Sequence, residues 1–398
     1  YNQMKSLIGI TTILTISLSA QAQNFDQLLN SVLSNNQAVA SSRYANESEL
    51  LNLKSENNLP DPEVEVEYQW GRHEVGDKFD INVSQGFDWP GVYRARGKAI
   101  ATASRAMEFL DRSNYIDKKL EIKLLFIDII NARKNISLLK SRIGIMDELI
   151  DKYTHGQERG ELTILDINKI KIERAKLNNS LSSIESDYEM LCSTLVGENG
   201  GKECNSLIEQ LNEYPDDMIL PVDNYEMMLT ENNPMNNYSS LMSQSQAQMV
   251  QAEKLSRLPG FTLGYHHSWE DGDVFNGLVV GMTLPFFSTR HKVKAAKAMQ
   301  QSLAYQEESV ASQLHATMMG NRNKALSLHR QLDSYGKALG NDDNARLLKM
   351  ALDGGQISIL DYLGEMAYFL EARQDYLDLQ YRYNQALAEL NKYTLVTE

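Results

Sequence analysis

Few residues in this chain have the types and the spacing that catalysis requires. Residues Gly197 to Lys202 imitate a phosphate-binding loop, but the spacing is one residue short and Glu203 stands where Ser or Thr is needed. His266 and His267 are adjacent in a predicted strand, so their side chains point to opposite faces and do not share a metal ion unaided. The motifs Gly-x-Ser-x-Gly, His-Glu-x-x-His and Cys-x-x-Cys are absent from the sequence. We therefore expect no enzyme, no cofactor and no resident metal.

Carboxylates are concentrated in one short alternating stretch. Glu63, Glu65 and Glu67 are same-face neighbours in a predicted strand, and they are too alike to divide into an acid and a base. Asp80 has the equivalent position in the next predicted strand. The residues that alternate with these four are Val64, Val66, Tyr68, Trp70, Phe79 and Ile81. This pattern predicts a hairpin within residues 62–90, with one apolar face and one carboxylate-rich face.

Residues 1–22 have the features of a secretory signal peptide. Lys5 is followed by an apolar run of about a dozen residues and then by Ala20-Gln21-Ala22, a small-x-small cleavage site. The run is too short to cross a bilayer as a helix. We therefore expect cleavage near Ala22 and export. The net charge of −14 argues against nucleic acid as a partner.

The two cysteines of the chain are Cys192 and Cys204. In an exported protein, a close cysteine pair commonly forms a disulfide. A metal site would need more ligands, and no His lies near either cysteine in the sequence. We therefore predict a disulfide that closes a loop of about a dozen residues.

A short motif occurs twice, roughly 195 residues apart. Gly160 to Asp166 returns as Gly355 to Asp361, each copy between two long helical patterns. In each copy, the Gly takes the left-handed conformation that ends the incoming helix, and the following Thr or Ser caps the outgoing helix. The Asp three residues later favours the positive end of that helix. We call this predicted helix–turn–helix segment the tip.

The tips belong to a larger repeat, which predicts one supersecondary unit written twice. Leu59-Pro60 matches Leu258-Pro259, and Arg94 with Lys98 matches Arg290 with Lys294. We place the first repeat at residues 23–215 and the second at residues 216–398, and expect them to form one intertwined domain. The repeats contain hairpin 62–90 and tip 156–166 in the first half, and hairpin 261–285 and tip 353–361 in the second.

The segments between hairpins and tips have the periodicity of long helices. We predict a first helix over residues 25–57 and a helix of about 60 residues from Gly91 to His155. The second repeat predicts a similar helix from about Thr289 to Leu352. Apolar residues recur at sevens in the helices that return from both tips, which is typical of coiled-coil packing. Gly197 to Lys202 ends the first returning helix.

Four strands per chain do not close a barrel, and an open sheet edge is not tolerated inside a membrane. Closure needs a larger even number of strands, so shared closure by several chains is the economical solution. The carboxylate face suits a wet interior, and the Tyr and Trp residues suit membrane interfaces.

In these features the sequence resembles the TolC-like outer-membrane channel subunits of Gram-negative efflux and export systems. The shared features are the duplicated order of helix, hairpin, long helix, tip and returning helix, and the tip signature Gly-x-x-Ser/Thr-x-x-Asp. Leu59 to Pro62 and Gln85 to Gly91 also resemble the branch that serves heavy-metal and cation efflux pumps. The chain lacks the acylated N-terminal Cys that is common in that branch.

The resemblance implies a mostly α fold with a small β part. A homotrimer would form a twelve-stranded barrel in outer-membrane lipid, continued by a periplasmic barrel of twelve helices. Gly160 and Gly355 would then dock a periplasmic adaptor that connects to an inner-membrane pump of the resistance-nodulation-division type. Asp361, Asp166 and Glu365 would lie at the gate, and Glu63, Glu65, Glu67 and Asp80 would line the barrel lumen.

The resulting hypothesis is a passive exit duct of a tripartite pump that exports small molecules or metal cations across the outer membrane. The alternative hypothesis is a periplasmic coiled-coil adaptor or scaffold that forms no channel. Adaptors share the long helical hairpin, but they usually carry a small Gly-rich β-domain that this sequence lacks.

Overall fold

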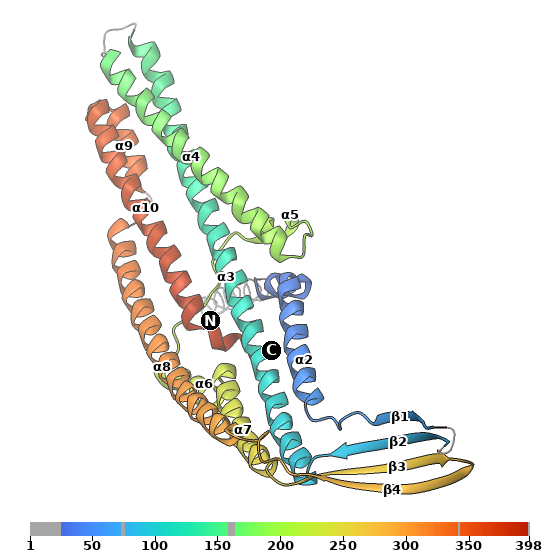
Figure 1. Ribbon diagram of the computed structural model, residues 1–398. Coiled ribbons are helices and arrows are strands. Elements are labelled where there is room, and N and C mark those ends of the chain that lie inside the picture. Colours follow the sequence, from blue (N-terminus) through green and yellow to red (C-terminus); the bar gives the residue numbers. More distant parts are fainter. Residues whose placement is uncertain (1–24, 73–75, 158–163, 341–342, 397–398) are drawn as a thin grey trace, which may run out of the picture. The chain divides into compact units, whose positions relative to one another are not determined.

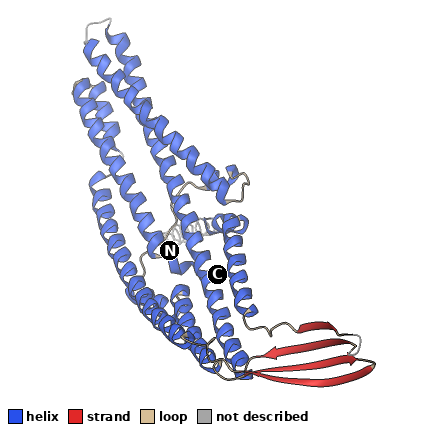
Figure 2. Cartoon of the chain, viewed as in Figure 1, coloured by secondary structure: helices blue, strands red, loops and turns tan. Residues whose placement is uncertain are grey.

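A computed structural model describes residues 25–72, 76–157, 164–340 and 343–396 (Figure 1). The predicted signal peptide and Gly160 lie outside these described residues. The elements are, in order, a helix over residues 25–35, α2 (Gln37–Ser55), β1 (Glu63–Trp70), β2 (Asp77–Phe87), α3 (Pro90–Gln157), α4 (Ile164–Glu198), α5 (Asn205–Gln210), α6 (Val222–Glu231), α7 (Pro234–Leu255), β3 (Gly260–Glu270), β4 (Asp273–Thr283), α8 (Lys292–Leu339), α9 (Asp343–Asp353), α10 (Ile359–Leu390) and the 3₁₀ helix η1 (Lys392–Val396). The predicted fold class, mostly helical with a small β part, is confirmed (Figure 2).

The longest element is α3, which confirms the long helix predicted after the first hairpin. It has 68 residues and begins at Pro90. The first N–H groups of a helix have no partner within it, so the missing N–H of a proline costs no hydrogen bond at this position. At 1.5 Å per residue the helix is about 100 Å long. After α4, Gly200 and Gly201 take φ angles of 68° and 80°, which ends that helix near the predicted position. A Cβ atom on Gly200 would lie 2.6 Å from the carbonyl oxygen of Asn35.

Two of the predicted helices are interrupted. The first breaks at Asn36, whose side-chain oxygen accepts a hydrogen bond of 3.1 Å from the Val39 N–H and so caps α2. The second long helix ends at Leu339 and a new helix begins at Asp343. Gly340 lies at this break with a φ of 62°, a left-handed conformation that ends a helix.

The four strands form one antiparallel sheet in the order β1-β2-β3-β4. β1 pairs with β2 and β3 pairs with β4, which confirms both predicted hairpins. Asp271 and Gly272 have φ angles of 47° and 93°, the conformation of a two-residue hairpin turn. β2 also pairs with β3, where Gly264 permits close approach: a Cβ there would lie 2.9 Å from the Val83 carbonyl oxygen. The two repeats therefore meet inside one sheet.

The chain divides into two compact units, and each unit combines segments from both halves of the sequence. Among the described residues, the first unit draws on 25–40, 115–225 and 316–396, and the second on 41–114 and 226–315. The sheet lies in the second unit. The repeat boundaries at residues 23–215 and 216–398 stay a prediction.

Two apolar clusters hold the first unit together. One lies between the helix over residues 25–35, α3, α4 and α5, with Phe25 and Phe126 in edge-to-face contact at 5.4 Å. The other joins α3, α4, α9 and α10, and its fully buried members include Ile170 and Met366. α9 and α10 lie side by side in Figure 1. Helices next to the two tips therefore share one core.

The predicted disulfide is wrong, because Cys192 and Cys204 are both free thiols. Both side chains belong to the first apolar cluster, but each interacts with a different group. The Cys204 thiol donates to the Lys202 carbonyl oxygen at 3.4 Å, and Cys192 is hydrogen-bonded to Tyr188 one turn earlier in α4. Burial raises the pKa of both thiols, which disfavours the reactive thiolate. Short spacing along the chain did not bring the two sulfurs into bonding contact.

None of the helices in the described ranges combines the length with the apolar character that crossing a bilayer requires.

Candidate functional site

The register of the sheet assigns each strand residue to one of two faces, since directly paired residues project to the same side. Glu67, Asp80 and Ser268 are paired across β1, β2 and β3, so they share a face. We call this the polar face. On the first three strands it consists of Glu63, Glu65, Glu67, Gln69, Lys78, Asp80, Asn82, Ser84, Thr262, Gly264, His266, Ser268 and Glu270, and on β4 it continues with Asp273, Phe275, Gly277, Val279 and Gly281.

The opposite side, which we call the apolar face, carries large hydrophobic side chains on all four strands. Its main members are Val64, Val66, Tyr68, Trp70, Phe79, Ile81, Val83, Phe87, Phe261, Leu263, Tyr265, Trp269, Leu278, Val280 and Met282. Many of them are exposed: Leu278 is 87% and Trp70 is 80% accessible. An apolar surface of this extent marks a contact with lipid or with another protein.

The four residues predicted to line a lumen all lie on the polar face, but their surroundings differ. Glu63, Glu65 and Glu67 are exposed, whereas Asp80 is only 6% accessible. The Asp80 carboxylate lies 3.5 Å from the Lys78 ammonium group and 3.4 Å from Nε2 of His266. Asp80 therefore lies between an ammonium group on its own strand and an imidazole on β3, and we call these three ionisable residues the charge cluster.

Sequence reasoning missed His266 as a neighbour of Asp80. The two residues lie on different hairpins, separated by nearly half the chain, and only the β2–β3 pairing brings them together. The alternation of His266 with Tyr265 does place it on one face of its own strand. The described part of the chain contains no group of three or more His, Cys, Asp or Glu side chains that could hold a metal ion.

The second tip has the predicted local structure. Gly355 takes a φ of 69°, and its N–H donates to the Leu352 carbonyl oxygen at 3.1 Å as α9 ends. Ser358 is the N-cap of α10: its hydroxyl oxygen accepts a 3.1 Å hydrogen bond from the Asp361 N–H. The Asp361 carboxylate in turn accepts from the Ser358 N–H at 3.3 Å, which completes a capping box. The sequence pattern Gly-x-x-Ser-x-x-Asp thus acts as a helix stop followed by a helix start.

Asp361 and Glu365 are both exposed and lie four residues apart on α10, so they project from the same side of the helix. Their gating role stays a prediction, since within one chain the Asp361 carboxylate serves as a cap. Of the first tip, Gly160 lies outside the described residues, and Asp166 is the third residue of α4.

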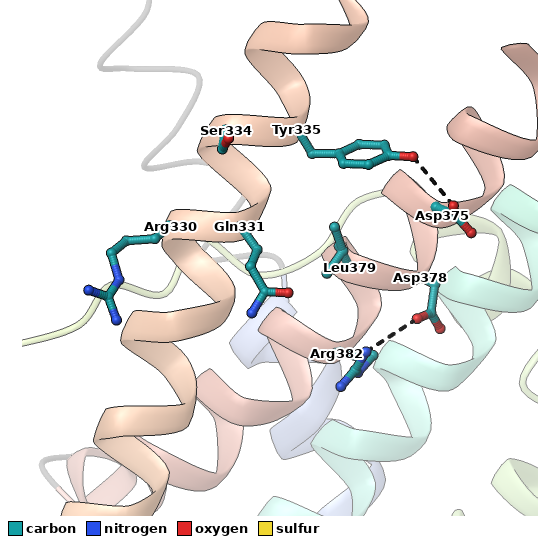
Figure 3. Close-up of a pocket in the computed structure, with 8 residues that line it drawn as sticks. All are labelled: Arg330, Gln331, Ser334, Tyr335, Asp375, Asp378, Leu379 and Arg382. Atoms are coloured by element: carbon teal, nitrogen blue, oxygen red, sulfur yellow. Dashed lines mark hydrogen bonds and ion pairs between the residues drawn. The ribbon is translucent and has the colours of Figure 1, made fainter.

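A shallow groove of about 560 Å³ lies between α8 and α10 in the first unit (Figure 3). It is lined by Arg330, Gln331, Ser334, Tyr335, Asp375, Asp378, Leu379 and Arg382. The Tyr335 hydroxyl donates to Asp375 at 3.3 Å, and Arg382 lies 3.8 Å from Asp378. The first contact joins α8 to α10, and the second is an i,i+4 pair within α10; neither places a reactive pair together.

No protein-family model matches the chain, and no curated protein matches its sequence. Solved structures, in contrast, match nearly all of it. The CmeC outer membrane channel of Campylobacter jejuni matches with a TM-score of 0.73 and 16% identity, covering 93% of this chain and 85% of that chain. The chain has the TolC-like fold.

Two further structures share the TolC-like fold. A membrane protein from Pseudomonas aeruginosa matches with a TM-score of 0.77 and 15% identity, over 93% of this chain and 92% of that chain. CusC, described by its folding and transmembrane channel formation, matches with a TM-score of 0.74 and 12% identity, over 93% and 92%. CusC and CmeC have nearly equal TM-scores, 0.74 and 0.73, so the TolC-like fold alone does not single out the heavy-metal branch.

Proposed function

We propose that three copies of this chain form an outer-membrane channel, the passive exit duct of a tripartite efflux pump. The observation that carries the proposal is the sheet. Its outer strands, β1 and β4, are each paired on one side only within the described residues, and its two faces are opposite in polarity. Closure into a barrel with other copies would pair the free edges of β1 and β4. It would also place the apolar face in lipid and the polar face around water.

The strand lengths support this assembly. β2 and β4 have 11 residues each, close to the 9–11 residues of tilted transmembrane strands. Three copies of four strands give twelve, an even number within the range of known barrels. In this barrel Glu63, Glu65, Glu67 and Asp80 line the lumen and favour cations or neutral molecules over anions.

The helices would continue the barrel as a periplasmic tunnel, with each repeat supplying one hairpin and one tip. The glycines of the tips, Gly160 and Gly355, would dock the adaptor, which links the duct to a resistance-nodulation-division pump in the inner membrane. Asp361, with Asp166 and Glu365, would line the narrow end. Threefold symmetry brings like charges together there, which attracts cations. The exported substrates would be small molecules or metal cations.

The alternative, a periplasmic adaptor or scaffold that forms no channel, is disfavoured by the apolar face. In a water-exposed sheet, side chains such as Leu278 and Val280, 87% and 76% accessible, would remain in contact with solvent. Their burial in lipid removes this cost.

Two measurements test the proposal together. The mass of the intact protein in detergent should correspond to three chains, and the protein should open ion-conducting pores in planar bilayers. A monomer that remains soluble without detergent and forms no pores would favour the adaptor hypothesis instead.

A further inference from the structure

The charge of this chain is distributed unevenly around the sheet. The net charge is −14, yet residues 89–107 and residues 274–306 contain no Asp or Glu. These two stretches carry eight basic residues, Arg94, Arg96, Lys98, Arg105, Arg290, Lys292, Lys294 and Lys297. They include the pairs Arg94/Lys98 and Arg290/Lys294, which match between the two repeats. We call the segments where β2 leads into α3 and β4 leads into α8 the two junctions.

Both junctions lie at the same end of the sheet. Phe87, at the end of β2, pairs with Phe261, and Thr283, at the end of β4, pairs with Gly260. The hairpin turns lie at the opposite end, where Trp70 is paired across to β2. That opposite end carries the carboxylates Asp77, Glu270, Asp271 and Asp273. Asp61, Glu63 and Asp88 also lie at the junction end, and Arg72 and Lys78 at the turn end, so basic residues outnumber acidic ones at the junctions and acidic residues outnumber basic ones at the turns. We call these the basic end and the acidic end of the sheet.

The repeated basic side chains point away from the protein. Arg94 and Lys98 are exposed and one turn apart on α3, while Val92 and Ala99 are fully buried. In the second repeat, Arg290 and Lys294 are exposed, with Val293 buried between them. None of the four forms an ion pair within the described residues, whereas their neighbour Arg96 lies 3.5 Å from Asp88.

Exposed aromatic side chains accompany these cations. Phe286 and Phe287 are 74% and 87% accessible in the turn that follows β4. Two hydrogen bonds order this turn. The Thr289 hydroxyl donates to the Pro285 carbonyl oxygen at 2.9 Å, and the Arg290 N–H donates to the Phe287 carbonyl oxygen at 3.2 Å. At the other junction Trp89 packs 5.9 Å from Phe261, a member of the apolar face.

We propose that the two junctions bind anionic phospholipid headgroups of the periplasmic leaflet of the membrane, an inference that rests on the proposed function. Aromatic rings concentrate at the membrane interface, and the long stems of Lys and Arg reach from there to phosphate groups. An uncompensated cation near an anionic lipid surface adds to binding, and its contribution falls with ionic strength.

The dimensions match this placement. Eleven-residue strands are about 36 Å long, and a tilt of about 40° gives a height of roughly 28 Å, near the apolar band of about 25 Å. Arg94 and Lys98 lie about 6 and 12 Å beyond Pro90 along α3. The polar layer on each side of a bilayer is about 5–8 Å thick, so Arg94 lies within its depth. The Lys98 side chain tilts toward the helix N-terminus and reaches back to the same layer. The acidic end of the sheet would lie in the other leaflet, so lipopolysaccharide phosphates are not the occupants.

The test uses the trimer in detergent and counts retained lipids by native mass spectrometry after incubation with phosphatidylglycerol, phosphatidylethanolamine or lipid A. The variant replaces Arg94, Lys98, Arg290 and Lys294 by Gln. The matched control replaces four exposed cations of α4 and α8, Lys169, Lys171, Lys176 and Arg330, by Gln. The wild type and the control should retain phosphatidylglycerol over phosphatidylethanolamine, and the variant should lose this preference by about tenfold.

Three outcomes would overturn the inference: equal retention of the two phospholipids by the wild type, an unchanged preference in the variant, or a loss that affects only lipid A. Planar-bilayer conductance of the same trimers separates these from failure of the proposed function. A variant that conducts normally while retaining no excess phosphatidylglycerol supports the inference and the channel together. Preparations that form neither trimers nor pores refute both.

Discussion

A buried ion pair between α3 and the connector before α6 offers a sharp test of how the first unit is stabilised. Lys123 Nζ lies 2.6 Å from Asp217 Oδ2, and the side chains are 3% and 23% accessible. The contact is an ion pair rather than an aligned hydrogen bond, because that oxygen has no hydrogen-bond partner of good geometry in the described chain. Next to it, the Met218 carbonyl oxygen accepts a 3.0 Å hydrogen bond from Asn391, so the connector is also held to the end of α10.

Removing one partner of a buried pair costs about 3–5 kcal/mol, since the other charge is left without compensation. The two partners are unequally buried, so the cost depends on which one is removed. Lys123→Met leaves Asp217, which water partly hydrates, and should cost about 3 kcal/mol. Asp217→Ala leaves the lysine charge almost fully buried and should cost about 5 kcal/mol. The double variant should be more stable than Asp217→Ala alone.

Guanidinium unfolding followed by circular dichroism, at one fixed concentration of protein in detergent, measures these differences. The more exposed pair Lys134–Glu213, whose side chains are 23% and 58% accessible, is also 2.6 Å apart and also joins α3 to the connector, so it provides the control. Glu213→Ala should cost less than about 1 kcal/mol. A smaller loss in Asp217→Ala than in Lys123→Met, or a double variant less stable than both single variants, would refute the reasoning from burial.

Three further predictions concern lipid contact, pH and the tip. Leu278→Arg places a charge at the centre of β4 on the apolar face, which should cost about 2–4 kcal/mol of insertion free energy and reduce the amount of membrane-inserted trimer. Val279→Arg, on the polar face, should insert normally. Equal insertion of the two variants in outer-membrane fractions would contradict the assigned faces. Asp128 accepts a hydrogen bond from Tyr381, and burial raises the pKa of its carboxyl group. The folded state therefore binds a proton at Asp128 more tightly than the unfolded state does. As a result, the contribution of Asp128 to stability increases as the pH falls from 7 through the raised pKa. Asp128→Asn should therefore raise stability at pH 7 and reduce the pH dependence of the unfolding midpoint; an unchanged pH profile would contradict this. Asp361→Asn should lower cation selectivity in planar bilayers with little change in trimer stability, and unchanged selectivity with lowered stability would leave Asp361 as a cap only.

Local structure followed from the sequence wherever one periodicity or one turn residue decided it. The alternation of Glu and Val in β1 predicted the hairpin, and the absence of Pro and scarcity of Gly after Gly91 predicted the length of α3. At the second tip, Gly355 and Ser358 adopt the conformations expected of a helix stop and an N-cap. In each of these cases the deciding interactions lie within about four residues.

The sequence failed where the deciding interaction was distant. At the break at Asn36, the side-chain amide donates a 2.9 Å hydrogen bond to the carbonyl oxygen of Glu198 at the end of α4, a contact that periodicity does not reveal. The pairing of Asp80 with His266 requires β2 and β3 to meet. A disulfide required contact between the two sulfurs, which spacing along the chain does not define. The same holds for the candidate site: face assignment was predictable for the hairpins, while the charge cluster across them was not.

The pairing of β2 with β3 also determines the symmetry of the proposed barrel. This pairing joins the hairpins of the two predicted repeats, and two identical repeats would give a ring with sixfold symmetry. The two hairpins differ in charge: β1 contributes Glu63, Glu65 and Glu67, while the same face of β3 has Gly264, His266 and Ser268. Carboxylate-rich strands would thus recur at every fourth strand around the ring. A permeating cation would meet three separate negative tracks with weakly charged surface between them, rather than one uniform wall of charge.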